Sequence, residues 1–213
     1  MSAPVTVIIP TFNERDNIAP LVQKLEVALA GTDFEVIVGN DYPLLRISHE
    51  LLGISDPRAR FLNYAENLGE LGNMRHLLEQ SRGHYFTWLA DDDTYAREFL
   101  ALAYAVLKSQ NFPPVLFTGY SIGQTPPKVE SEGLSSRVLV LSGRRFLNGY
   151  LKRSFKVIGC YGLFDTNYLR KIGGMERLGN GFSPYSDNLL AIRSALCETV
   201  VLIDVPLVFF RTH

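Results

Sequence analysis

Three consecutive aspartates, Asp91, Asp92 and Asp93, follow the hydrophobic run at 85–89. Carboxylates held this close raise one another's pKa unless a cation neutralises them. A hard divalent ion, Mg²⁺ or Mn²⁺, would do so with one or two of these carboxylates and the phosphates of a substrate as ligands. A nucleotide diphosphate would then be the natural bridging ligand. The plainer alternative, a solvated acidic turn before a helix, is the more common arrangement for such a cluster taken by itself.

Three further side chains are candidates for chemistry, and each has an ordinary alternative. Asp187 precedes the apolar helical stretch 189–192, where it is either a helix N-cap or a general base for a hydroxyl nucleophile. His213 is either a frayed chain end or a nitrogen ligand for the same metals. Arg75 is either a surface arginine or a contact to phosphate or base.

Apolar periodicity indicates how these residues are positioned. In the first part of the chain, β-branched or aromatic runs alternate with helical patterns, which predicts a parallel sheet flanked by helices on both faces. The expected strands are 5–9, 34–38, 60–64 and 85–89, and the expected helices are 17–30, 44–52 and 70–80. Ligands of such sheets bind outside the carboxyl ends of the strands. Four polar clusters should therefore meet at one rim, namely 11–14, 40–41, 66–67 and 91–93.

The pattern is looser in the second part of the chain. A long Gly-, Pro- and Ser-rich loop is expected at 121–136, a Gly-rich hinge at 173–174 and 179–181, and Ser186 or Asp187 as the cap of a helix. The expected helices are 95–108, 143–151 and 187–196, and the expected strands are 115–119, 137–141, 157–164, 200–203 and 207–210.

Composition excludes several classes of protein. The 213 residues are 46% hydrophobic and 20% charged, which is typical of a globular chain, and a single domain over 1–213 is expected. A net charge of −1 without a basic tail argues against a nucleic-acid partner. Cys160 and Cys197 show no metal or redox spacing, and 1–10 lacks a signal-peptide pattern, which favours a cytoplasmic protein.

Five segments together resemble the inverting glycosyltransferases of family 2, which have the GT-A fold. The opening at 5–14 resembles the first strand and turn of that family, and 83–93 resembles the strand that ends in its DxD motif. The remaining similar segments are 67–69 with 74–75, 185–193 and 205–213. They occur in the family's order along essentially the whole chain.

The resemblance implies a Rossmann-like, mostly parallel sheet in a nucleotide-binding half at 1–118, and a small acceptor-side β/α half at 119–213. It implies a nucleotide-sugar donor, most readily a UDP-sugar, Mn²⁺ or Mg²⁺ as cofactor, and a saccharide or lipid-linked acceptor of polysaccharide or glycan biosynthesis. A lipid-linked acceptor is compatible with a position at the cytoplasmic face of a membrane. The segment 159–163 falls where donor sugar and acceptor meet.

The resemblance also assigns a role to each matching residue. Asp187 becomes the general base, and Asp92, Asp93 and His213 become the metal ligands. The nucleotide-binding residues implied are Thr11, Asn13, Glu14, Asp41, Arg75 and Asp91.

Three departures from the family pattern concern this site. The family's Asp-Asp-Gly-Ser after the second strand is Asn-Asp-Tyr-Pro at 40–43, which changes the loop expected to meet the base. Ser186 replaces the acid before the presumed general base, and Ala90 replaces the usual aspartate after Leu89.

Two other functions fit part of the pattern. A hydrophobic strand that ends in Asp-x-Asp also marks haloacid dehalogenase-like phosphatases, although that motif wants Thr or Val where this chain has Tyr95. A non-catalytic domain that binds nucleotide sugars is the other alternative, because a fold does not by itself specify a function.

Overall fold

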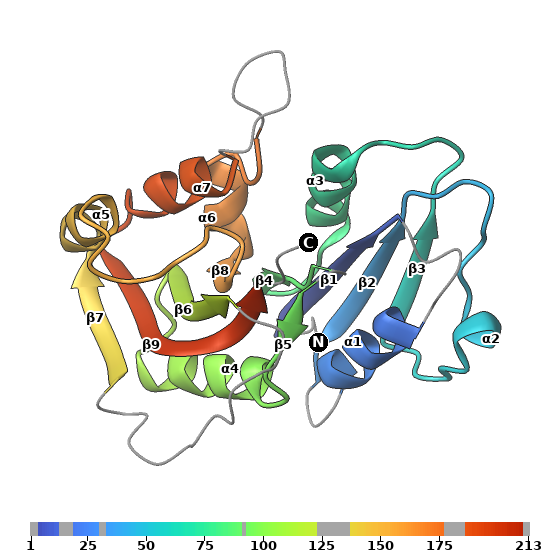
Figure 1. Ribbon diagram of the computed structural model, residues 1–213, viewed down its shortest axis with the longest axis horizontal. Coiled ribbons are helices and arrows are strands. Elements are labelled where there is room, and N and C mark those ends of the chain that lie inside the picture. The colour runs from blue at the N-terminus through green and yellow to red at the C-terminus, as the bar shows by residue number, and fades with distance from the viewer. Residues whose placement is uncertain are drawn as a thin grey trace. The chain divides into compact units, whose positions relative to one another are not determined.

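The computed structural model describes residues 4–12, 19–29, 33–90, 93–122, 137–176 and 186–210. The chain forms two compact units, Met1–Asp92 and Asp93–His213, whose elements are labelled in Figure 1.

The first unit is built on four parallel strands. They are β1 (Val5–Thr11), β2 (Glu35–Asn40), β3 (Ala59–Asn63) and β4 (Tyr85–Trp88), in the order β3-β2-β1-β4. The helices of this unit are α1 (Ala19–Leu29), α2 (His49–Leu52) and α3 (Glu70–Gln80). The predicted parallel sheet is confirmed, so the carboxyl ends of its strands share one edge.

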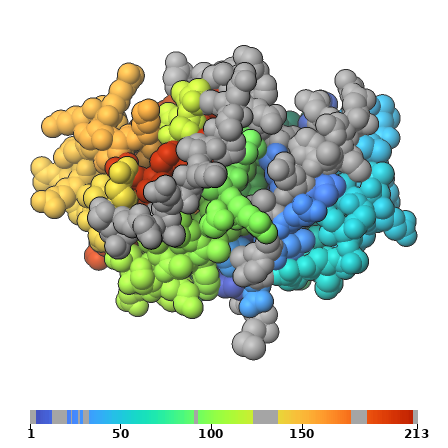
Figure 2. All heavy atoms as spheres, turned by 60° about the horizontal axis from the view of Figure 1, so that its bottom comes forward, coloured from blue at the N-terminus to red at the C-terminus, as the bar shows by residue number. Residues whose placement is uncertain are grey.

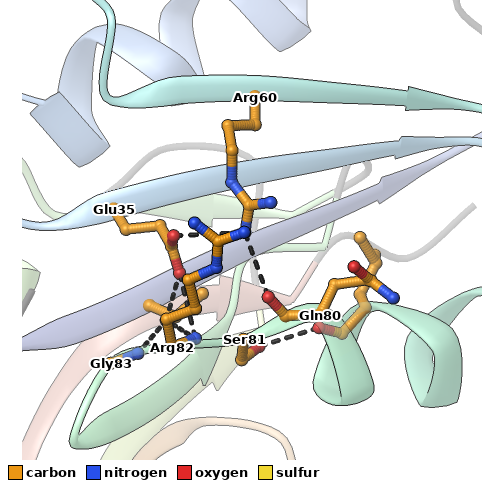
Figure 3. Close-up of polar contacts among 8 residues, drawn as sticks. Glu35, Arg60, Gln80, Ser81, Arg82 and Gly83 are labelled. Carbon is orange, nitrogen blue, oxygen red and sulfur yellow. Dashed lines mark hydrogen bonds and ion pairs between the residues drawn. The ribbon is translucent and has the colours of Figure 1, made fainter. Parts of the chain in front are cut away.

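A polar network lies at the amino-terminal ends of these strands (Figure 3). The buried Thr6 hydroxyl donates to Glu35 (2.7 Å) and accepts from the backbone N–H groups of Arg82 (3.2 Å) and Gly83 (2.7 Å). Arg60 donates to the second oxygen of Glu35 at 3.1 Å. These bonds join the starts of three strands to the turn that precedes β4.

The second unit has a mixed sheet. Its strands are β5 (Thr94–Tyr95), β6 (Val115–Ile122), β7 (Val138–Ser142), β8 (Gly162–Asp165) and β9 (Thr199–Phe210). Among the strand pairs described in this unit, β6 and β9 are parallel, whereas β5 and β7 pair with β9, and β8 with β6, in antiparallel fashion. Its helices are α4 (Phe99–Ser109), α5 (Gly143–Leu151), α6 (Thr166–Lys171) and α7 (Ser186–Ser194).

An aromatic cluster forms part of the core of the second unit. Phe117 of β6 stacks on Phe146 of α5 with ring centroids 5.0 Å apart, and Phe146 in turn stacks on Phe155 at 5.4 Å. Offset and edge-to-face aromatic pairs of this kind stabilise beyond their buried area. They fix α5 and the segment after it on the sheet.

The structure corrects the expectation of two terminal strands. Residues 199–210 form the single strand β9, and its register with β6 shifts at Gly119, opposite Pro206. Proline has no N–H for the ladder, and irregular pairing at such a point is typical of a β-bulge. The break in the apolar pattern near Pro206 is therefore an irregularity within one strand and not a loop between two.

Several other boundaries differ from the predicted ones. The expected strand 157–164 begins only at Gly162, the expected helix 44–52 only at His49, and the expected helix 95–108 only at Phe99, after the short strand β5. Helix α6 was not predicted. The predicted 70–80 and 143–151 helices are confirmed. The loop expected at 121–136 falls almost wholly outside the described residues.

The helices of the described ranges include none that is long and apolar enough to cross a membrane.

Replacement of Thr6 with Val should lower the free energy of unfolding by about 1–3 kcal/mol, because the Gly83 N–H loses its bond to the hydroxyl and Glu35 loses a donor while side-chain volume is kept. The Arg82 N–H keeps its bond to Glu35 Oε1 at 3.1 Å. Thr6→Ser retains the hydroxyl and serves as the matched control in urea titrations. A loss for Thr6→Val no larger than that for Thr6→Ser would show that the hydroxyl does not carry this network.

Candidate active site

The two consecutive residues Cys160 and Tyr161 link two predicted site aspartates within the second unit. The backbone N–H of Cys160 donates to Asp187 Oδ1 at 3.2 Å. The hydroxyl of Tyr161 donates a hydrogen bond to Asp93 Oδ2. The presumed general base and the last aspartate of the acidic trio therefore belong to one hydrogen-bonded group.

Asp187 sits in an environment that disfavours its charge. Burial raises the pKa of its carboxyl above the usual 3.8, and the hydrogen bonds from the Cys160 side chain and backbone only partly offset this rise. A carboxylate with a raised pKa is a better proton acceptor at neutral pH than an ordinary aspartate. The electrostatics therefore fit the predicted role.

Asp187 is not the cap of its helix. Helix α7 already begins at Ser186, so Asp187 is its second residue, and its Oδ1 atom accepts from another segment. The helix therefore starts at Ser186, one residue before the predicted start at 187, and neither residue is its N-cap.

Gly159 allows this contact. A Cβ atom at position 159 would lie 2.1 Å from the carbonyl oxygen of Asp187, well inside van der Waals contact. The following residues form a turn, with Tyr161 N–H bonded to Ile158 O at 3.1 Å and Gly162 N–H to Cys160 O at 3.1 Å. The turn places the Cys160 N–H against the carboxylate, which explains why the expected strand is shortened here.

Asp93 is buried, with 7% of its surface exposed. The pKa of its partner Tyr161 is raised, first by burial and then by the nearby Cys160 and by Asp93 itself. Tyr161 therefore stays a protonated donor toward the carboxylate. The segment 159–163 was expected near the reacting groups, but the separate roles of Cys160 and Tyr161 carry no signal in the sequence.

In the first unit, Thr11 and Asp41 lie at the carboxyl-end edge of the sheet, as predicted. Asp41 is buried, and its Oδ1 accepts the Leu68 N–H at 2.6 Å. Burial raises the pKa of Asp41, and the backbone N–H groups of Leu68 and Gly69 partly reverse the shift. The buried Thr11 Oγ1 has no hydrogen-bond partner among the described residues.

A pair of asparagines that was not predicted holds the loop after β2. Asn40 donates to Asn63 Oδ1 at 3.0 Å, and Asn63 exchanges two hydrogen bonds with the backbone of Ile47, at 2.7 and 2.9 Å. Tyr42 meets Phe12 edge to face, with ring centroids 5.8 Å apart. The departure from the family pattern at 40–43 thus places an aromatic pair at this edge of the sheet.

Of the other predicted site residues, only Arg75 lies within the described part of the chain. Arg75 is exposed in the middle of α3 and forms no ion pair with a described carboxylate. Asn13, Glu14, Asp91, Asp92 and His213 lie outside the described residues. Of the predicted metal ligands the structure therefore describes only Asp93. The described ranges contain no group of three or more His, Cys, Asp or Glu side chains arranged to hold a metal.

A cavity of about 490 Å³ lies in the second unit, next to the start of α7. Its wall includes Asn188, the next residue of α7, whose side-chain oxygen accepts from the Tyr150 hydroxyl at 2.6 Å. Asp187 lies close enough to raise the pKa of Tyr150, an effect second to that of burial. Tyr150 and Asn188 were not predicted as site residues.

Comparison with known proteins bears on the family and the fold. The model of the family described as "Glycosyl transferase family 2" matches residues 6–172. The crystal structure of S. aureus TarS has a TM-score of 0.70 and 18% sequence identity, and the match covers 98% of this chain and 36% of that one. The structure of S. aureus TarS 1-349 in complex with UDP-GlcNAc has a TM-score of 0.70, and the structure in complex with UDP has a TM-score of 0.69, both at 17% sequence identity.

These two matches cover 98% of this chain and 58% and 60% of the TarS chains. The chain therefore spans about one third to three fifths of the length of the structures it resembles. The similarity confirms the predicted α/β fold of the GT-A type. No curated protein matches the sequence.

Substitution of Tyr161 with Phe should lower the free energy of unfolding by about 1.5–3 kcal/mol, because the buried Asp93 carboxylate loses a hydroxyl donor. Tyr168→Phe is the control, since the Tyr168 hydroxyl donates to backbone carbonyls at 3.3 Å and should contribute less. Equal losses of unfolding free energy in denaturant titrations would mean that the Tyr161 hydrogen bond stabilises the protein no more than the Tyr168 hydrogen bonds do.

Proposed function

The chain belongs to glycosyl transferase family 2, and on this basis we propose that it is an inverting glycosyltransferase acting on a nucleotide-diphosphate sugar. The observation that carries the proposal is Asp187. Its carboxylate has a raised pKa and is oriented by the Cys160 N–H, and the next residue, Asn188, lines a cavity of about 490 Å³. Membership of this family favours sugar transfer over phosphoryl transfer.

The reaction proposed is a single displacement. Asp187 removes the proton of an acceptor hydroxyl, and the oxygen attacks the anomeric carbon of the donor on the side opposite the leaving group. A new glycosidic C–O bond forms as the bond to the nucleoside diphosphate breaks. Attack from the opposite side inverts the anomeric configuration, and the single base accounts for the one proton released.

We propose a UDP-sugar as the donor, because TarS structures hold UDP-GlcNAc and UDP. The nucleotide would be bound by Thr11, Asn13, Glu14, Asp41, Arg75 and Asp91. Two features of the first unit support this role for its carboxyl-end edge. Thr11 has a buried hydroxyl that no described residue uses, and Asp41 is a buried carboxyl beside the Phe12–Tyr42 ring pair.

Metal dependence is the next part of the proposal, with Asp92, Asp93 and His213 as the residues that would hold Mn²⁺ or Mg²⁺. Asp93 suits this role because carboxylate oxygens are the ligands these hard ions prefer. The buried Tyr161 hydroxyl bond fixes the orientation of its carboxylate. A bound metal would supply Lewis-acid stabilisation of the negative charge on the departing diphosphate.

The acceptor proposed is a saccharide or a lipid-linked sugar of polysaccharide or glycan biosynthesis, reached from the cytoplasm. This follows from the family resemblance, and the cavity next to the start of α7 offers the space for it.

Asp187→Asn should lower kcat for sugar transfer by at least about a hundredfold, because the amide cannot take the hydroxyl proton. Binding of UDP with Mn²⁺, measured by calorimetry, should stay within about twofold, since the amide oxygen can still accept from Cys160.

Glu198→Gln, an acid-to-amide change at an exposed position of the same unit, is the matched control and should keep full activity. Retention of wild-type turnover by Asp187→Asn would remove the proposed base, and loss of UDP binding in the same variant would point to misfolding.

Asp187→Asn should also be more heat-stable than the wild type at pH 7. Because the folded-state pKa of Asp187 is raised, its ionisation destabilises the folded protein at any pH above that value. The destabilisation fades as the pH falls through the folded-state pKa and is absent below the usual value of 3.8.

The Tm advantage of the variant should therefore shrink toward acidic pH in scanning calorimetry. An advantage that is absent at pH 7, or that grows toward acid, would contradict the assigned environment of the carboxyl.

A further inference from the structure

The cavity lined by Asn188, the residue after Asp187, has aromatic and polar walls. Three aromatic side chains line it, from β6, α5 and the segment that follows α5, namely Tyr120, Tyr150 and Phe155. Flat aromatic surfaces with polar tips are suited to the mixed apolar and hydroxyl faces of a sugar ring. The Tyr150 hydroxyl and the Asn188 side chain add hydrogen-bonding groups next to the base.

Two cationic side chains, Arg153 and Lys156, complete this wall. Both are exposed, and neither forms an ion pair with any carboxylate in the described ranges. The residues at the end of α5 and after it, gold to orange in Figure 2, lie at the surface of their unit. An unpaired guanidinium and an ammonium group on one cavity wall provide a site for an anion.

The backbone of Arg153 is strained. Its φ angle is 55°, in the left-handed region, and its N–H bonds to Tyr150 O at 3.0 Å as α5 ends. Glycine is the residue that normally occupies this position at the end of a helix, because a side chain there costs about 1 kcal/mol. Glycine would adopt this backbone conformation without strain, so the arginine is better explained by its side chain in the cavity wall.

We propose that this cavity is the acceptor subsite and that it selects an acceptor carrying an anionic group, a phosphate or a carboxylate, next to the sugar or polyol that presents the hydroxyl. The aromatic side chains would pack on the ring, Arg153 and Lys156 would hold the anion, and Asp187 would face the hydroxyl. The proposal rests on the proposed glycosyl transfer for the identity of the ligand, but anion binding itself can be tested without it.

The test is the binding of small probes to the whole chain in the absence of donor and metal. Binding is monitored by the NMR chemical shifts of ¹³C-labelled tyrosines. Glucuronate supplies the carboxylate arm, glycerol 1-phosphate the phosphate arm, and glucose the neutral arm. At least one anionic probe should bind about tenfold more tightly than glucose and shift the Tyr120 and Tyr150 signals. Its affinity should fall as salt is raised. Equal affinity for all three probes would overturn the proposal.

Arg153→Gly is the decisive variant, because it relieves the strained φ angle and should not destabilise the protein. It should weaken anion binding by about tenfold or more, which corresponds to the loss of one charged hydrogen bond. Lys156→Gln should weaken it as well. Arg144→Gln, on the exposed surface of α5 and away from the cavity lining, is the charge-matched control and should bind like the wild type.

A loss for Arg144→Gln equal to that for Arg153→Gly would mean that only net charge attracts the probe, and the subsite would be withdrawn. UDP binding is measured in parallel. Absence of UDP binding with intact anion binding would count against the proposed glycosyl transfer alone, whereas intact UDP binding without anion selectivity would count against the subsite alone.

Discussion

The desolvated carboxylate of Asp187 is the feature on which the rest of the account depends. It is stabilised by the N–H of Cys160 and destabilised by burial, and burial is the larger effect. Gly159 is required beside it, because any side chain there would collide with the Asp187 backbone. The charge that would make Asp187 a useful base is therefore held at a cost to folding, as is common at functional sites.

The two units position their proposed site residues in different ways. In the first, parallel strands bring Thr11 and Asp41 to one edge by topology alone, and the Thr6–Glu35–Arg60 network at the far edge holds the strands in register. In the second, a turn at 158–161 joins the two acidic residues by direct hydrogen bonds. Strand topology positions the proposed nucleotide residues, and a turn positions the proposed base.

Periodicity was sufficient to predict most of the first unit, because β1, β2 and β3 are short strands that are each followed by a helix. It failed at Tyr161, whose apolar neighbours suggested a strand where the chain turns to meet Asp187. It also missed the Asn40–Asn63 pair and the Tyr150–Asn188 contact, because a hydrogen bond between distant residues leaves no local pattern. Asp187 was predicted as the general base from family resemblance, whereas its burial and raised pKa needed the structure.

The most direct test of this account is an NMR titration of the wild-type protein carrying ¹³C-labelled aspartate, with the Asp187 carboxyl signal assigned by its disappearance in Asp187→Asn. The account predicts a titration midpoint clearly above 3.8, the usual value for this group. A midpoint at or below 3.8 would show that the hydrogen bonds outweigh burial, and the explanation of Asp187 as a base tuned by desolvation would be wrong.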